Sequence, residues 1–180
     1  HDIARFYSIV GEDTSKYKMA FAWLLTARGI PQMYYGSEVL MTGFTSPNDG
    51  YVRQDFPGGW EGDAKNKFYT DGRSKKENNV FNYIRTLANY RKSSPALTKG
   101  KLIQYLPVDG VYVYFRYTDQ QTIMCMMNTN TDAVKLNTQR FSERLGKSLR
   151  AKNIVTGETI DLSNTLELKP YTNLVVELLP

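Results

Sequence analysis

The chain has 180 residues, of which 41% are hydrophobic and 23% charged, and its formal net charge is +5. This length and apolar fraction suffice for a buried core in one domain or two small ones, which excludes wholesale disorder. The positive charges form no patch, and no apolar run reaches the roughly 18 residues of a membrane span, so we expect neither a nucleic-acid partner nor a transmembrane segment. The single cysteine, Cys125, excludes an internal disulfide framework.

The first periodic stretch predicts a helix from Lys16 to Arg28, followed at once by a strand. Apolar residues recur there at helical spacing on one face, Thr14 and Ser15 are N-cap candidates, and Gly29 is a C-terminal stop. Residues 30–35 read IPQMYY, which predicts a short, fully buried strand. A helix that leads into a buried strand is typical of α/β folds with a parallel sheet.

Residues 36–78 form a long irregular stretch rich in Gly, Asp, Asn, Pro and aromatic residues. Loops longer than about 15 residues are uncommon in compact domains and tend to be functional or disordered. The aromatic side chains, Trp60 among them, predict an ordered loop that is packed on the domain. A second helix is predicted from Asn79 to Lys92, where Ser93-Ser94-Pro95 ends it.

From Leu97 onward the pattern changes to short strands separated by turn residues, which predicts an antiparallel sandwich. Asp109-Gly110 predicts a hairpin turn. Along residues 111–117, Val111, Val113 and Phe115 alternate with Tyr112, Tyr114 and Arg116, which places the aliphatic set inward and the alternating tyrosines outward. The tyrosines of this strand region suggest either a platform for carbohydrate or, more often, a surface packed against a neighbouring domain. They are Tyr112, Tyr114 and Tyr117, and the strand candidates of the chain are residues 102–105, 111–117, 122–128, 133–136, 152–155 and 173–179.

Few residues in the chain are suited to catalysis. His1 is the only histidine, so the chain contains neither a Ser-His-Asp triad nor a multi-histidine metal site. The glycine-rich phosphate-binding patterns are missing as well. The pair His1-Asp2 remains, and taken alone it fits a frayed terminus as well as a functional site. What is left is carboxylate chemistry, which a single sequence does not locate.

Two segments resemble the α-amylase family, glycoside hydrolase family 13. Residues 27–38, ARGIPQMYYGSE, resemble the sequence through which a helix leads into the eighth barrel strand of that family. Residues 1–6, HDIARF, stand about 30 residues upstream, at the spacing of the family's segment after the seventh strand. Residues 81–97 resemble the eighth helix. The resemblance implies an α/β plus all-β fold, in which residues 1–96 are the C-terminal segment of a (β/α)8 TIM barrel and residues 97–180 an antiparallel β-sandwich domain.

The same resemblance implies roles for four residues. Asp2 would be the catalytic carboxylate that stabilises an oxocarbenium-like transition state through sugar hydroxyls, and His1 would bind the same sugar. Residues 48–53, NDGYVR, resemble a substrate-binding segment of cyclomaltodextrinases and neopullulanases, with Gly50 in place of a proline. Asp49 and Arg53 would therefore bind substrate, although an ordinary polar turn also explains this segment. The family's nucleophile and acid/base lie on earlier strands, and no residue here replaces them.

The resemblance implies a retaining glycoside hydrolase that cleaves α-1,4-glucosidic bonds in maltodextrins, cyclodextrins or starch, most like neopullulanase or cyclomaltodextrinase. We expect the isolated chain to be inactive and to hold no cofactor, with any calcium bound upstream. It would associate with the missing barrel portion or with another copy of itself. A periplasmic or secreted location is favoured over a cytoplasmic one. The alternative function is a non-catalytic starch-binding or structural β-module.

Overall fold

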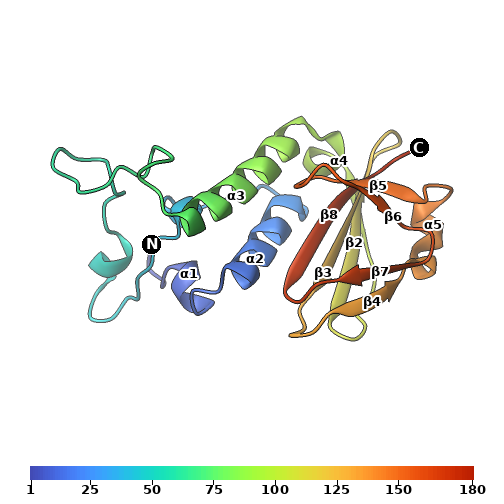
Figure 1. Cartoon of the computed structure of the whole chain (residues 1–180), viewed down its shortest axis with the longest axis horizontal. Coiled ribbons are helices and arrows are strands. Elements are labelled where there is room, and N and C mark those ends of the chain that lie inside the picture. Colours follow the sequence, from blue (N-terminus) through green and yellow to red (C-terminus); the bar gives the residue numbers. More distant parts are fainter. The chain divides into compact units, whose positions relative to one another are not determined.

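The computed structural model describes residues 1–180, which form two compact units. Unit 1 comprises residues 1–17 and 31–85, and unit 2 comprises residues 18–30 and 86–180. The boundaries run through the two long helices, α2 (Thr14–Thr26) and α3 (Lys75–Ser93), so each helix contributes to both units (Figure 1). The division predicted between residues 96 and 97 stays a prediction. No helix combines the length and the apolar character needed to cross a bilayer.

Unit 2 is built on two antiparallel sheets (Figure 1). The larger sheet has six strands in the order β1-β2-β3-β8-β5-β6, so the C-terminal strand β8 is inserted between β3 and β5. The smaller sheet pairs β4 with β7. The predicted sandwich is confirmed, although β6 and β7 were not among the strand candidates. The bounds are β1 Lys101–Gln104, β2 Val111–Tyr117, β3 Thr122–Asn128, β4 Val134–Asn137, β5 Arg150–Asn153, β6 Thr159–Asp161, β7 Thr165–Leu168 and β8 Thr172–Leu178, with short helices α4 Pro95–Thr98, η3 Thr138–Phe141 and α5 Ser142–Leu145.

The main hydrophobic core of unit 2 draws on both sheets. Phe115 on β2 is fully buried and packs with side chains of the smaller sheet and of the η3–α5 segment. This arrangement removes a large apolar area from water and is the main source of stability for the unit. The buried members are Val111, Val113, Phe115, Met124, Met126, Leu136, Phe141, Leu145, Ala151, Leu162, Leu168 and Val176.

The hairpin turn between β1 and β2 confirms the prediction from Asp109-Gly110. Both residues have positive φ, 49° and 70°, which is the combination that a type I′ turn requires. Val108 and Val111 exchange two backbone hydrogen bonds across the turn, with N···O distances of 3.1 and 2.9 Å. The turn therefore fixes the register with which β2 begins.

The face of β2 predicted to point outward is buried as well, which corrects the sequence analysis. Tyr114 and Arg116 are each 1% exposed. The Tyr114 hydroxyl lies 2.5 Å from the Thr26 hydroxyl. For Tyr114 an exposed platform is therefore wrong, and the favoured alternative of a packed surface holds, because its hydroxyl meets Thr26 of α2 within the same unit. Because both faces of β2 are covered, alternation in the sequence did not distinguish an exposed face from a second buried one.

The C-terminal end of α2 is capped by two arginines. Arg116 donates from Nη1 to the carbonyl oxygens of Thr26 (2.9 Å) and Ala27 (2.8 Å). Arg91 donates to the carbonyl oxygens of Leu25 (2.9 Å) and Gly29 (2.6 Å). These donors satisfy carbonyl groups that a helix end leaves unpaired. The helix ends at Thr26, two residues before the predicted end.

The starts of the two long helices also differ from prediction, in both cases because of a side-chain cap. Asp13 Oδ1 accepts hydrogen bonds from the backbone N–H groups of Ser15 and Lys16, at 2.8 and 3.2 Å, so Asp13 rather than Thr14 or Ser15 caps α2. Ser74 and Glu77 cap each other's backbone N–H groups at 3.2 and 2.7 Å. This capping box starts α3 at Lys75, four residues before the predicted start.

Residues 30–35, predicted as a buried strand, form neither a strand nor a buried segment. Ile30 is 98% exposed, and Met33 and Tyr35 are 42% and 40% exposed. A buried parallel strand needs hydrogen-bonding neighbours beside it and helices over its faces. No strand pairs with this segment in the structure, which is why its apolar side chains face solvent.

The remainder of unit 1 is mostly irregular, and its order comes from hydrogen bonds rather than from packed aromatic rings. Its short helices are α1 (Phe6–Ile9), η1 (Ser37–Val39) and η2 (Asp49–Val52). Trp60 and Phe68 are 67% and 61% exposed, so the prediction of a loop packed through its aromatic residues is wrong. Arg73 instead donates to the carbonyl oxygens of Lys67 and Phe68, at 2.9 and 3.2 Å. These bonds order the loop, while Trp60 and Phe68 remain largely exposed.

Candidate functional site

Unit 1 brings together the four site residues that the sequence indicated, although they lie up to 52 positions apart. Arg53 is the centre of this cluster. Its Nη2 donates to Asp2 Oδ1 at 2.6 Å and to Asp49 Oδ2 at 2.9 Å. Its Nε donates to the main-chain carbonyl oxygen of His1 at 3.1 Å. Two segments that the sequence only suggested separately therefore form one polar site.

The histidine and the carboxylate at the start of the chain also contact each other. His1 Nε2 lies 3.1 Å from Asp2 Oδ1. The side chains of His1 and Asp2 are each 65% exposed, and those of Arg53 and Asp49 are 45% and 44% exposed. Ion pairs this open to water contribute little to the stability of a fold. The cluster therefore adds little to the free energy of unfolding and forms an accessible array of hydrogen-bonding groups.

The local structure of residues 48–53 explains how Asp49 and Arg53 come to point the same way. Asn48 Oδ1 accepts a hydrogen bond from Gly50 N at 2.9 Å and so caps the short helix η2. Asp49 begins the 3₁₀ turn and Arg53 directly follows it as the C-cap residue, so the turn brings Arg53 Nη2 back to within 2.9 Å of Asp49 Oδ2. A proline at position 50 has no N–H and could not make the capping bond, so the glycine supports this turn in a different way from the resembled segment.

Arg5 anchors the segment that follows the His-Asp pair, and sequence analysis gave it no role. It is 4% exposed, and its backbone N–H donates to the Gly43 carbonyl oxygen at 2.8 Å. Its guanidinium donates to the Tyr35 carbonyl oxygen and lies over the rings of Tyr34 and Tyr35, 4.4 and 4.6 Å from their centroids. The signal in the sequence was the place of Arg5 in HDIARF, the segment on which the family resemblance was based.

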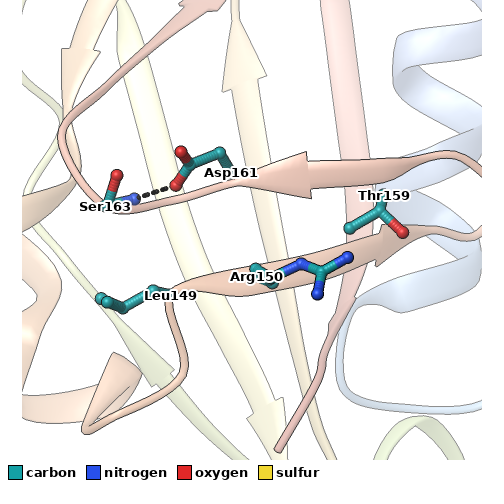
Figure 2. A pocket seen from close by; sticks show the side chains of 5 residues that line it. All are labelled: Leu149, Arg150, Thr159, Asp161 and Ser163. Carbon is teal, nitrogen blue, oxygen red and sulfur yellow. Dashed lines mark hydrogen bonds between the residues drawn. The ribbon is translucent and has the colours of Figure 1, made fainter.

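Two surface pockets lie elsewhere, in unit 2. One of about 510 Å³ lies beside the β5–β6 hairpin and is lined by Leu149, Arg150, Thr159, Asp161 and Ser163 (Figure 2). Hydrogen bonds from Ser163 hold the pKa of Asp161 below its usual value. The other, of about 440 Å³, adjoins the β1–β2 hairpin and contains Tyr112, whose hydroxyl donates to Gln104 Oε1 at 2.6 Å. Neither pocket contains a residue of the predicted site, so the Arg53-centred cluster remains the candidate.

Comparison with known families assigns both parts of the chain. Residues 1–72 match the α-amylase catalytic domain, and residues 102–177 match the C-terminal domain of cyclo-malto-dextrinase. The chain belongs to the α-amylase family. The resemblance stated from residues 1–38 is therefore confirmed, as is the fold of a barrel segment followed by a β-sandwich.

Individual relatives point the same way. The chain is 29% identical over 178 residues to a cyclomaltodextrin glucanotransferase of Geobacillus stearothermophilus, covering 94% of this chain and 22% of that protein. It is 29% identical over 167 residues to an α-amylase of Niallia circulans, covering 88% of this chain and 28% of that protein. The crystal structure of an α-amylase from Geobacillus thermoleovorans superposes on the whole chain with a TM-score of 0.75 at 23% identity, covering 37% of that structure. The chain thus spans between a fifth and two-fifths of the relatives' length.

Proposed function

We propose that these residues are part of a retaining glycoside hydrolase that cleaves α-1,4-glucosidic bonds in maltodextrins, cyclodextrins or starch. The observation that carries the proposal is the convergence of Asp2 and His1 with Asp49 and Arg53 in one solvent-accessible cluster. Carboxylate, imidazole and guanidinium groups are the hydrogen-bonding partners that sugar hydroxyls need. Membership of the α-amylase family and the names of the relatives support an α-glucan as the substrate.

Each residue has a distinct role in this proposal. Asp2 is the catalytic carboxylate that accepts hydrogen bonds from ring hydroxyls, and this interaction strengthens as positive charge develops at the anomeric carbon. His1 donates to the same sugar. Asp49 and Arg53 hold a glucose unit further toward the non-reducing end. Asp2 does not attack the anomeric carbon, because a group placed beside the ring hydroxyls is in the wrong position to do so.

The proposal requires the nucleophile and the acid/base from other parts of a longer enzyme. Three features support an association with further barrel strands. Residues 31–35 expose apolar side chains, two buried nitrogen atoms of Arg5 have no hydrogen-bond partner, and one buried carboxylate oxygen of Glu38 has none either. We assign no cofactor to these residues, and any calcium is proposed to bind elsewhere in the enzyme. A periplasmic or secreted location also remains a proposal.

The deciding experiment replaces Asp2 by Asn in the intact enzyme. This change keeps the shape of the side chain and removes its charge. Losing a preorganised electrostatic partner of this kind costs on the order of 10²–10³ in kcat. The measurement is kcat and KM on maltoheptaose or a cyclodextrin, with Arg85→Ala on the exposed face of α3 as a control. A variant within about tenfold of wild type, which is roughly 1.4 kcal/mol, would contradict the role of Asp2.

A further inference from the structure

Arg53 contacts the His1-Asp2 segment at two points, one on the backbone and one on a side chain. Nε donates to the carbonyl oxygen of His1 at 3.1 Å, and Nη2 donates to Asp2 Oδ1 at 2.6 Å. The guanidinium group is planar and its N–H bonds have fixed directions. A two-point contact from such a group therefore determines both the path of the segment and the direction in which the Asp2 carboxylate points.

The two oxygen atoms of Asp2 differ in their contacts with the protein. Oδ1 receives Arg53 Nη2 at 2.6 Å and also lies 3.1 Å from His1 Nε2. The side chain is still 65% exposed, and neither contact involves Oδ2. One oxygen is therefore held by the protein while the other is available to a hydroxyl group of a bound sugar.

Asp49 in turn holds Arg53. Its Oδ2 accepts from the same Nη2 at 2.9 Å, and both residues belong to the capped turn at η2. A long arginine side chain loses considerable conformational entropy when it is fixed. The Asp49 contact supplies part of that order before substrate arrives, so the guanidinium does not depend on Asp2 alone for its position.

We propose that Arg53 is a positioning residue for Asp2, in addition to binding a sugar unit. The inference rests on the proposed function. Arg53 orients Asp2 Oδ2 toward the hydroxyls of the sugar at the cleaved bond by holding Oδ1 and the His1 carbonyl oxygen. Its effect on catalysis then extends to substrates too short to reach the sugar-binding position next to Asp49.

Substrate length separates this role from sugar binding. We would compare maltoheptaose, which reaches Asp49, with 4-nitrophenyl α-glucoside, whose single glucose unit stays at the cleaved bond. In the intact enzyme, Arg53→Ala should lower kcat on the aryl glucoside by about 10- to 100-fold, because a displacement of roughly 1 Å at a catalytic group has costs of this size. Arg53→Lys should fail to restore kcat, since one ammonium nitrogen lacks the two separate donor atoms, fixed in one plane, with which Arg53 reaches His1 and Asp2. Arg85→Ala, an exposed arginine on α3, is the matched control.

A double-mutant cycle gives a second, independent readout. If Arg53 acts through Asp2, then Arg53→Ala should lower kcat further by less than about twofold in an Asp2→Asn background. Additive losses, or an Arg53→Ala enzyme with wild-type kcat on the aryl glucoside and a raised KM on maltoheptaose alone, would overturn the inference. Thermal melting of each variant detects a folding defect. If Arg53→Ala fails to fold, the same cycle is measured with Arg53→Lys in its place. Wild-type enzyme inactive on both substrates would instead refute the proposed function.

Discussion

The two units of this chain achieve order in different ways. In unit 2, ladder hydrogen bonds between strands and a core shared by two sheets satisfy most polar groups and bury the large side chains. In unit 1, residues 36–74 contain no strand and no α-helix, only two short 3₁₀ turns. Side chains such as Asp63, Arg53 and Arg73 supply the hydrogen bonds that backbone ladders supply elsewhere.

This difference bears on where function lies. Regular structure with a closed core is stable but offers few free polar groups, whereas a loop held by side chains can present them to a ligand. Unit 1 contains the whole Arg53-centred cluster. Buried polar atoms without a hydrogen-bond partner occur in both units, on Arg5 and Glu38 in unit 1 and on Tyr105, Arg116 and Arg144 in unit 2. Unit 2 thus holds the closed hydrophobic core, while unit 1 carries the candidate site.

The same substitution in each unit should give the largest contrast. Phe115 is fully buried in the core of unit 2, whereas Phe68 in unit 1 is 61% exposed and lies against Phe56 with ring centroids 4.5 Å apart. Phe115→Ala should lower the free energy of unfolding by about 3–5 kcal/mol through lost burial and a residual cavity. Phe68→Ala should change it by less than about 1 kcal/mol.

Urea unfolding followed by circular dichroism would measure both changes. Leu106→Ala in unit 2 is a further control, because that side chain is 82% exposed and should behave like Phe68 rather than like Phe115. Equal losses for Phe115→Ala and Phe68→Ala would show that the rings of the irregular loop are part of a core after all. The contrast between the units would then fail.

Two buried arginines sharpen the comparison, since each donates to backbone carbonyl oxygens within its own unit. Arg116 donates hydrogen bonds to the carbonyl oxygens of Thr26, Ala27 and Gly100 in unit 2. Replacing it by Met keeps the volume but removes the Arg116 hydrogen bonds to all three carbonyl oxygens, of which that of Ala27 keeps only its bond from Arg91, so unit 2 should lose about 2–4 kcal/mol. Arg73→Met should instead loosen the loop of unit 1 and change the stability of unit 2 by less than about 1 kcal/mol.

The two tryptophans provide a reporter for each unit. Trp23 belongs to unit 2 and Trp60 to unit 1, and the chain has no other tryptophan. With either one replaced by Phe, the fluorescence of the other follows a single unit through urea unfolding. If Arg73→Met shifts the Trp23 transition as far as Arg116→Met does, then the units unfold together and the arginine bonds in the loop support the whole chain.

The sequence predicted what depends on local chemistry. Asp109-Gly110 defines its turn within two residues, and the alternation of residues 111–117 together with the apolar run of residues 122–128 defines two strands, β2 and β3, whose bounds match the structure. Residues 30–35 were misjudged because an apolar run reports a tendency to be buried, while burial itself depends on neighbouring strands that this structure does not contain. Capping by Ser74 and Glu77 was visible as an S-x-x-E pattern and could have been used.

The candidate site was located through the family resemblance, because residue types and spacing alone did not identify it. His1-Asp2 and Asp49-Arg53 each had an ordinary explanation as polar surface, and no spacing rule connects positions about 50 residues apart. Only the folded path of the chain brings Arg53 to Asp2. Buried Arg116 and Tyr114 were misjudged for the same reason, because the residues that cover them come from α2 and lie far away in the sequence.

The smallest expected effect concerns pH and the single cysteine of unit 2. Burial raises the pKa of the Cys125 thiol to about 12, although hydrogen bonds with Thr26 and Tyr114 oppose this shift. Since the unfolded thiol loses its proton near its ordinary value of 9.0, the unfolded state binds fewer protons above that pH. The stabilisation is therefore complete below pH 9 and is lost progressively up to about pH 12.

Between pH 8 and pH 10, wild type should lose about 1.4 kcal/mol more unfolding free energy than Cys125→Ala. Urea unfolding of both proteins at each pH gives the comparison, in which the cavity left by alanine contributes a constant offset. Parallel pH curves would mean that the thiol is accessible to water, and that the closed interior assigned to unit 2 is open at β3.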